Sequence, residues 1–195
     1  MLAAKKIGTS DVSFVIPRRN WTSGTVYDYY RHDYGNRITG TTTTQTSTSG
    51  ATTLFDATFY VLTADKRVYK CLDNAGNTAS TTEPTGTSTS VIETADGYKW
   101  KYMYTLSASE QANFLSTDFM GVSTDSTVSS AAVDGALDIV KIKTAGSSYT
   151  ISGGATSGTI TAIPVRGDGT GGVVSVTLTS GAITAVTVTT RGSGY

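Results

Sequence analysis

Cysteine, proline and net charge are scarce in this 195-residue chain. Cys71 is its single cysteine, which excludes an internal disulfide framework and a zinc site built from several cysteines. Fifteen lysines and arginines balance fifteen aspartates and glutamates, so no excess charge attracts nucleic acid or an anionic membrane surface. No apolar run is long enough to span a bilayer, and the start of the chain lacks the apolar stretch of a secretory signal. We therefore expect no nucleic-acid or membrane partner and no export.

Small polar residues dominate the composition instead. The chain has 37 threonines, 22 serines and 21 glycines but three prolines, which favours strands and turns over helices and predicts a mostly β fold. Two Thr- and Ser-rich stretches, 39–53 and 77–90, offer too little apolar surface to offset the entropy of ordering. Both are predicted to be long exposed loops.

Two shorter patterns predict a strand and a hairpin. The run Val12–Ile16 is rich in β-branched and aromatic residues and stops at Pro17, which lacks the N–H group that a central strand needs. Further along, the apolar runs 57–62 and 68–72 flank the short polar segment 63–67. This spacing predicts a β-hairpin.

The clearest periodicity follows Gly97, where largely cationic positions alternate with four aromatic residues. These are Tyr98, Trp100, Tyr102 and Tyr104. Period-two alternation predicts a strand with one aromatic face and one largely cationic face. Directly after this row, Ser107 and Glu110 have the spacing of a capping box, in which the two side chains satisfy the first free amides of a helix. A short helix is therefore predicted there.

The last third of the chain has a different composition, because aromatics nearly vanish and Val, Ile, Thr and Gly take over. We therefore predict a domain at 1–121, a linker at 122–134 and a Gly/Thr-rich β-repeat domain at 135–195. Segments 135–149 and 181–195 align without a gap and share seven of fifteen residues, at a spacing typical of repeated supersecondary units. Each copy is predicted to be a strand followed by a glycine turn that Tyr closes. A unit this small needs more sequence or a partner to cover its apolar face.

Three segments resemble, in this order, the baseplate wedge subunit of contractile-tailed, T-even-like bacteriophages, the gene-product-eight family: VIPRRNW at 15–21, VYKCLD at 68–73 and DGYKWKY at 96–102. The resemblance extends from residue 15 to about 106. It implies a non-enzymatic structural protein with a β-sandwich core, a homodimer, and packing against other wedge proteins in the tail baseplate of the virion. Family members carry a longer segment before the double arginine, so we expect this chain to be part of a longer protein. The tail after residue 135 does not resemble the family.

Arginines and aromatics are enriched at interface hot spots, so they are the candidate interface residues of this chain. The partner-interface residues predicted in this way are Arg18, Arg19, Trp21, Tyr98, Trp100, Tyr102 and Tyr104. Two other interpretations stay open: the arginines can tie loops together within one subunit, and the aromatic row can form a core. The alternative function is a carbohydrate-binding tail adhesin, in which the aromatic row stacks on sugars.

Catalytic chemistry finds little support in the sequence. His32 and Asp33 have no positioned nucleophile or second ligand beside them. The segment 167–172 (GDGTGG) lacks the lysine and the strand–helix setting of a phosphate loop, so it is predicted to be a turn between strands. Cys71 lies in an apolar strand pattern and is predicted to be a buried, inert thiol. We predict no catalytic residues, no cofactor and no metal.

Overall fold

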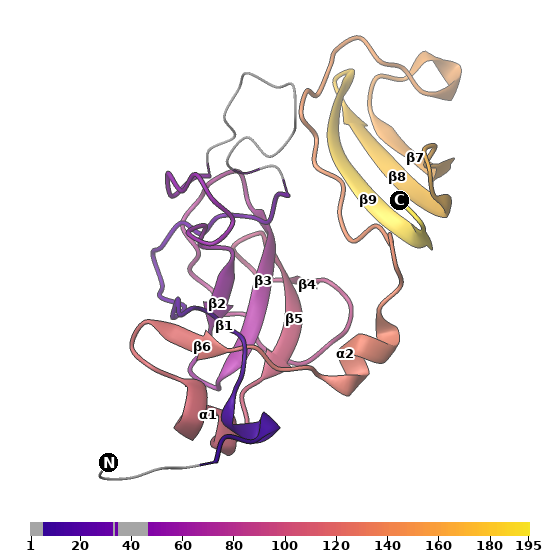
Figure 1. Ribbon diagram of the computed structural model, residues 1–195. Coiled ribbons are helices and arrows are strands. Elements are labelled where there is room, and N and C mark those ends of the chain that lie inside the picture. The colour runs from indigo at the N-terminus through magenta and orange to yellow at the C-terminus, as the bar shows by residue number, and fades with distance from the viewer. Residues whose placement is uncertain (1–5, 33, 35–46) are drawn as a thin grey trace. The chain divides into compact units, whose positions relative to one another are not determined.

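The computed structural model describes residues 6–32, 34 and 47–195, so part of the predicted loop 39–53, and Asp33, lie outside the described residues. The chain is mostly β, as predicted, and its sheets are antiparallel. It divides into two compact units, Met1–Ala131 and Ala132–Tyr195 (Figure 1). Among the described residues, no helix combines the length and apolar character that a membrane span requires.

The first unit is built on a four-stranded antiparallel sheet. Its strands are β2 (Tyr60–Leu62), β3 (Arg67–Asn74), β5 (Tyr98–Thr105) and β4 (Ile92–Glu93), in that order across the sheet (Figure 1). Strands β2 and β3 form the predicted hairpin, with Tyr60 opposite Lys70 and Leu62 opposite Val68. Strand β5 contains the aromatic row, so its period-two alternation does correspond to a strand.

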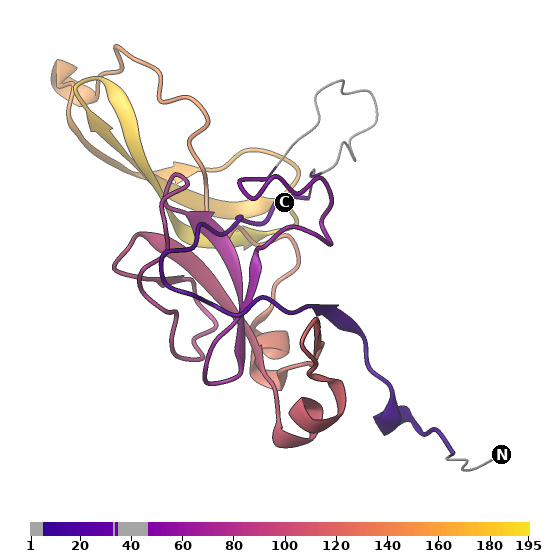
Figure 2. The same ribbon diagram turned by 90° about the vertical axis from the view of Figure 1, so that its left-hand side faces the viewer.

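A two-stranded ribbon and two short helices complete the unit. The ribbon pairs β1 (Val15–Pro17) with β6 (Phe119–Gly121), and β1 ends at Pro17 one residue beyond the predicted strand. Before β1 lies a single 3-10 turn, η1 (Thr9–Asp11). Figure 2 shows the segment from η1 to β1 projecting away from the four-stranded sheet.

The two α-helices begin where the sequence supplies N-caps. Helix α1 (Ala108–Phe114) starts at the predicted capping box, because Ser107 Oγ accepts from Glu110 N and Ser107 N donates to the Glu110 carboxylate at 2.7 Å. Helix α2 (Ser126–Ala131) follows Asp125, whose carboxylate accepts from the N–H groups of the first turn. This helix lies within the predicted linker 122–134, and the first unit extends to its end.

Two side-chain clusters form the core of the first unit. The smaller cluster packs the sheet against the ribbon and contains Leu62, Val68, Tyr104, Leu106 and Met120. The larger cluster is unusually aromatic for so small a unit, and its buried members are Tyr27, Tyr34, Ala57, Phe59, Val61, Tyr69, Cys71, Tyr98, Trp100 and Tyr102. Large rings with polar tips thus supply most of the buried area.

The second unit is a three-stranded antiparallel meander. Its strands are β7 (Gly158–Pro164), β8 (Thr170–Thr179) and β9 (Ala182–Ser193), preceded by the 3-10 turn η2 (Ser152–Gly154). Of its apolar side chains, only those of Val174 and Leu178 are buried among the described residues. The unit therefore owes much of its stability to strand pairing rather than to a deep core.

The two repeat copies differ in structure, which corrects one prediction. The second copy forms β9, but no strand is assigned over 135–149, so the predicted strand of the first copy is wrong. The first copy instead runs antiparallel to β9 and bonds to it at both ends. Leu137 N donates to Arg191 O at 2.9 Å, and Ile183 N donates to Ala145 O at 3.0 Å.

Candidate functional site

The aromatic row on β5 is the core of the first unit and not an interface. Tyr98, Trp100, Tyr102 and Tyr104 are each at most 5% exposed within the single chain. Tyr98 stacks on Trp100 with ring centroids 5.4 Å apart. Because a partner cannot reach side chains that the chain itself covers, the predicted interface role of these four residues is wrong. For the same reason they cannot stack on a sugar.

Hydrogen bonds of the hydroxyl groups compensate for the burial of the tyrosines in the aromatic row. Tyr98 Oη donates to the carbonyl of Thr78 at 2.6 Å, and Tyr104 Oη donates to the carbonyl of Gly121 at 3.0 Å. Burial also raises the pKa of Tyr98 to about 12, so its hydroxyl stays protonated at any physiological pH. These hydroxyls are structural groups and not acid–base groups.

The double arginine and Trp21 lie at the surface of the unit, where all three side chains are half-buried. Arg18 Nε donates to Asn20 Oδ1 at 2.9 Å, and Arg18 Nη1 donates to the carbonyl of Ser116 at 2.8 Å. Arg18 therefore ties two segments of one chain together, which is the alternative that the sequence left open. Arg19 Nη1 donates to the carbonyl of Arg18 at 3.3 Å. A contact of this region with a partner stays a prediction.

Beside these residues lies a cleft of about 370 Å³, which we call the polar cleft; it is lined by Arg18, Asn20, Trp21, Leu62, Thr63, Ala64, Lys66 and Glu83. One wall is the segment after β1, held against the end of β2 because Trp21 N donates to Leu62 O at 2.8 Å and Leu62 N to Arg19 O at 2.7 Å. The β2–β3 turn forms the second wall. Glu83 enters from the loop 77–90, and its carboxylate accepts from Ala64 N at 3.1 Å.

Asp96 fixes the orientation of the Trp21 indole ring through Ser80. Trp21 Nε1 donates to Ser80 Oγ at 3.1 Å, and Ser80 Oγ donates to Asp96 Oδ2 at 3.1 Å. The same carboxylate also accepts from Thr81 N, Thr82 N, Thr94 Oγ1 and Tyr98 N. Partial burial alone would raise the pKa of Asp96, but these donors outweigh it and lower the pKa to about 2.

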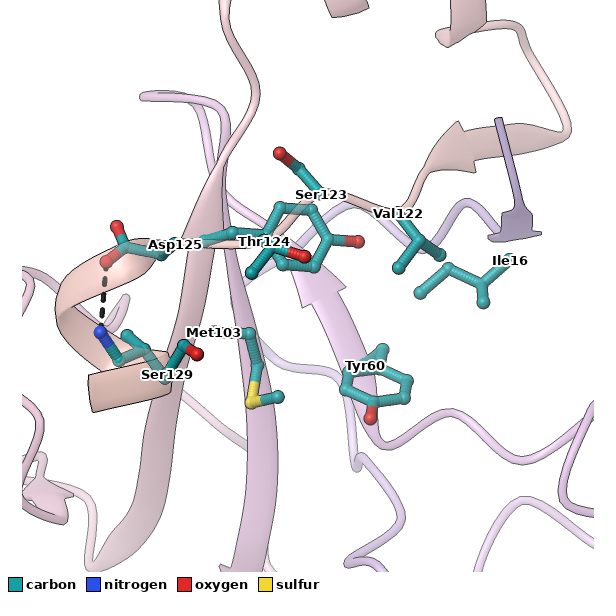
Figure 3. Close-up of a pocket in the computed structure, with 10 residues that line it drawn as sticks. Ile16, Tyr60, Met103, Val122, Ser123, Thr124, Asp125 and Ser129 are labelled. Atoms are coloured by element: carbon teal, nitrogen blue, oxygen red, sulfur yellow. Dashed lines mark hydrogen bonds between the residues drawn. The ribbon is translucent and has the colours of Figure 1, made fainter. Parts of the chain in front are cut away.

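A second hollow, the apolar groove, lies between the sheet, the ribbon and α2 (Figure 3). Its volume is about 290 Å³, and its apolar lining comes from Ile16, Tyr60, Met103, Tyr104, Val122 and Val128. Polar side chains border the groove on the α2 side, among them Ser123 and Asp125. Hydrogen bonds from the N-terminal amides of α2, Val128 N first, lower the pKa of the Asp125 carboxyl below its ordinary value.

The ribbon next to this groove exposes apolar side chains that sequence analysis did not single out. Phe14 is 87% exposed although its carbonyl accepts from Val122 N at 2.8 Å, so the residue is fixed by its backbone while its ring faces solvent. The other exposed apolar residues on or next to the ribbon are Val12, Val15, Phe119 and Val122, and Ile7 is exposed in the segment before η1. The sequence signal for them is the apolar run Val12–Ile16, which predicts a strand but not which of its side chains stay exposed.

The remaining candidate groups stay apart from one another. His32 is exposed, and the described residues hold no cluster of three or more His, Cys, Asp or Glu side chains that could bind a metal ion. Cys71, the single cysteine, is buried in β3, as predicted. The segment 167–172 spans the turn between β7 and β8 and the start of β8, as its lack of a lysine indicated.

Comparisons with known proteins add no relative: no family model matches the chain, and no curated protein or solved structure resembles it significantly.

Proposed function

We propose that this chain is a non-enzymatic structural component of a phage tail baseplate, a wedge subunit that acts by binding a second copy of itself and neighbouring wedge proteins in the virion. The observation that carries the proposal is the apolar ribbon surface, which exposes Phe14 and Val122 on the face of the apolar groove and Val15 and Phe119 on the opposite face. Exposed apolar surface of this kind marks protein–protein interfaces. The three motif segments within 15–102 supply the link to the wedge family.

The apolar groove enlarges the ribbon surface on one side. A standard stable interface buries about 800 Å² per partner, which is more than the few exposed side chains on one face of the ribbon offer. The polar rim of the adjacent apolar groove can contribute the rest. We therefore propose the ribbon, whose apolar side chains are exposed, as the interface in place of the aromatic row, which is buried.

Light scattering of the purified chain and of two charge-introducing variants tests self-association. We expect a dimer for the unmodified chain and for Val133→Asp, a matched control at a 49% exposed position outside the ribbon, and a monomer for Phe14→Asp. Tail localisation is tested separately, by labelling negatively stained phage particles with antibodies raised against the chain. Monomer at high concentration, together with no binding to co-expressed wedge proteins and no label at the tail end, overturns the proposal.

A further inference from the structure

The polar cleft has the composition of a small-molecule site, although no assembly role requires one. Its volume of about 370 Å³ falls within the roughly 300–1,000 Å³ typical of ligand pockets. Its walls belong to one unit and are joined by main-chain hydrogen bonds between Arg19, Trp21 and Leu62. Because these bonds fix the walls, the cleft is formed before any ligand arrives.

Trp21 supplies a flat apolar surface whose orientation is fixed. Trp21 packs against the aromatic core and also lines the cleft. Its indole N–H group is already bonded to Ser80, which Asp96 holds in turn. The ring can therefore contact a ligand through its carbon atoms rather than through a hydrogen-bond donor.

Two cationic hydrogen-bond donors and one anionic acceptor line the cleft together with Trp21. Arg18 uses Nε and Nη1 for bonds within the chain and has five N–H donors, so it keeps donors for a ligand. Lys66 Nζ donates to Ala64 O at 3.1 Å and has further protons to donate. On the accepting side, Glu83 uses Oε1 for Ala64 N, and a carboxylate accepts more than one bond.

We propose that the polar cleft binds a neutral saccharide, with one sugar ring against the face of Trp21 and its hydroxyls bonded to Arg18, Lys66 and Glu83. A sugar hydroxyl both donates and accepts, which matches a lining that offers cations and a carboxylate together. The Glu83 carboxylate repels an anion that the two cations would otherwise attract. An acidic peptide is for that reason the poorer fit. This inference does not depend on the proposed assembly role.

Two-dimensional proton–nitrogen NMR of the full chain tests the proposal directly. The chain has two tryptophans, of which Trp100 is fully buried, so each indole N–H signal has a clear expected response. We would titrate maltose, cellobiose and diacetylchitobiose separately to about 20 mM, and an Asp-Glu dipeptide in parallel. At least one disaccharide is expected to shift the Trp21 signal saturably and leave the Trp100 signal in place.

Two fold-sparing variants sharpen the test. Lys66→Asn keeps the turn, because Lys66 has a φ of 61° and asparagine tolerates that region, and it is expected to weaken binding about tenfold. Its matched control, Lys143→Asn at an exposed position in the second unit, is expected to bind as the unmodified chain does. Glu83→Gln keeps the acceptor for Ala64 N but puts an NH₂ group in place of the second carboxylate oxygen, so it is expected to weaken saccharide binding about three- to tenfold.

Three results would overturn the proposal. The first is no shift of the Trp21 signal with any of the saccharides. The second is a shift with the acidic dipeptide but with no saccharide, strengthened by Glu83→Gln, which would identify an anion site. The third is saccharide binding that Lys66→Asn leaves unchanged, because the sugar would then lie elsewhere.

Discussion

Replacing Asp96 by asparagine tests whether one carboxylate organises the loop 77–90 behind the polar cleft. Its two oxygens accept five hydrogen bonds, three at Oδ2 and two at Oδ1. In Asp96→Asn, whichever way the amide is turned, its NH₂ group faces N–H or O–H donors and cannot accept from them. At least one backbone amide therefore loses its acceptor: that of Tyr98 if the NH₂ group replaces Oδ1, or those of Thr81 and Thr82 if it replaces Oδ2.

The expected magnitude follows from the pKa of Asp96. A fall from the ordinary value of 3.8 to about 2 corresponds to at most about 2.5 kcal/mol, and solvent screening reduces this to about 1–2 kcal/mol. Because the folded-state pKa is the lower one, this stabilisation is complete above about pH 4 and is lost as the pH falls through about 2. The variant should therefore be less stable by about 1–2 kcal/mol at pH 7, and the difference should shrink toward pH 2.

Urea unfolding followed by tryptophan fluorescence measures this difference, since Trp21 and Trp100 both lie in the first unit. Asp118→Asn, at an exposed aspartate, is the matched control and is expected to change stability by less than about 0.5 kcal/mol. Asp28, a buried aspartate with a lowered pKa, contributes acid sensitivity to every variant and cancels in the difference. A loss that is equal at every pH from 7 to 2, or no loss at all, would refute the assignment of the stabilisation to the Asp96 carboxylate.

Three further changes test separate parts of the molecule. Ser107→Ala removes the N-cap of α1 and should cost about 1 kcal/mol in the same urea assay, whereas Ser109→Ala within the helix should not. Gly192→Ala places a Cβ within 2.5 Å of the backbone of β8 at a φ of 61°, so NMR should show the second unit disrupted while tryptophan fluorescence still reports a folded first unit. Phe14→Asp should abolish self-association and should leave the urea midpoint unchanged at protein concentrations where the unmodified chain is monomeric, because the ring makes few contacts within its own chain. A shared loss of both units on Gly192→Ala would contradict their independence.

The aromatic row illustrates how far alternation alone can predict a structure. Period-two spacing predicted both the strand and the shared face of its rings, because successive side chains of a strand point to opposite sides. It could not predict which atoms cover that face. The covering rings, among them Tyr27 and Tyr34, come from segments outside the regular strands. The carbonyl that accepts from Tyr98 lies in the loop 77–90, and the one that accepts from Tyr104 lies in β6, a strand of the separate ribbon.

The polar cleft was predictable only in part, for a related reason. Arg18 and Trp21 stood out because they are close in sequence and chemically suited to recognition. Lys66 and Glu83 join them only through tertiary structure, since the hairpin turn and the loop 77–90 meet at the backbone N–H of Ala64. Nothing in the spacing of these residues indicates that they converge, so the sequence suggested an interface where the structure contains a lined cleft.

The repeat in the second unit indicates that the two copies conserve a turn rather than a strand. In both, Tyr folds back over the glycine three residues earlier, Tyr149 over Gly146 and Tyr195 over Gly192, and both glycines have positive φ. The exchange between copies is reciprocal, because Tyr149 N donates to the first glycine of the second copy and Tyr195 N to Gly135 of the first, each at 3.0 Å. The middle segments of the two copies differ in their surroundings. Strand β9 is paired with β8 along its length, whereas the first copy lies at the edge of the sheet. Charged residues at that edge, such as Lys141 and Lys143, discourage further strand pairing. Sequence identity therefore predicted the local turn correctly, and only the neighbouring strand determines which copy becomes part of the sheet.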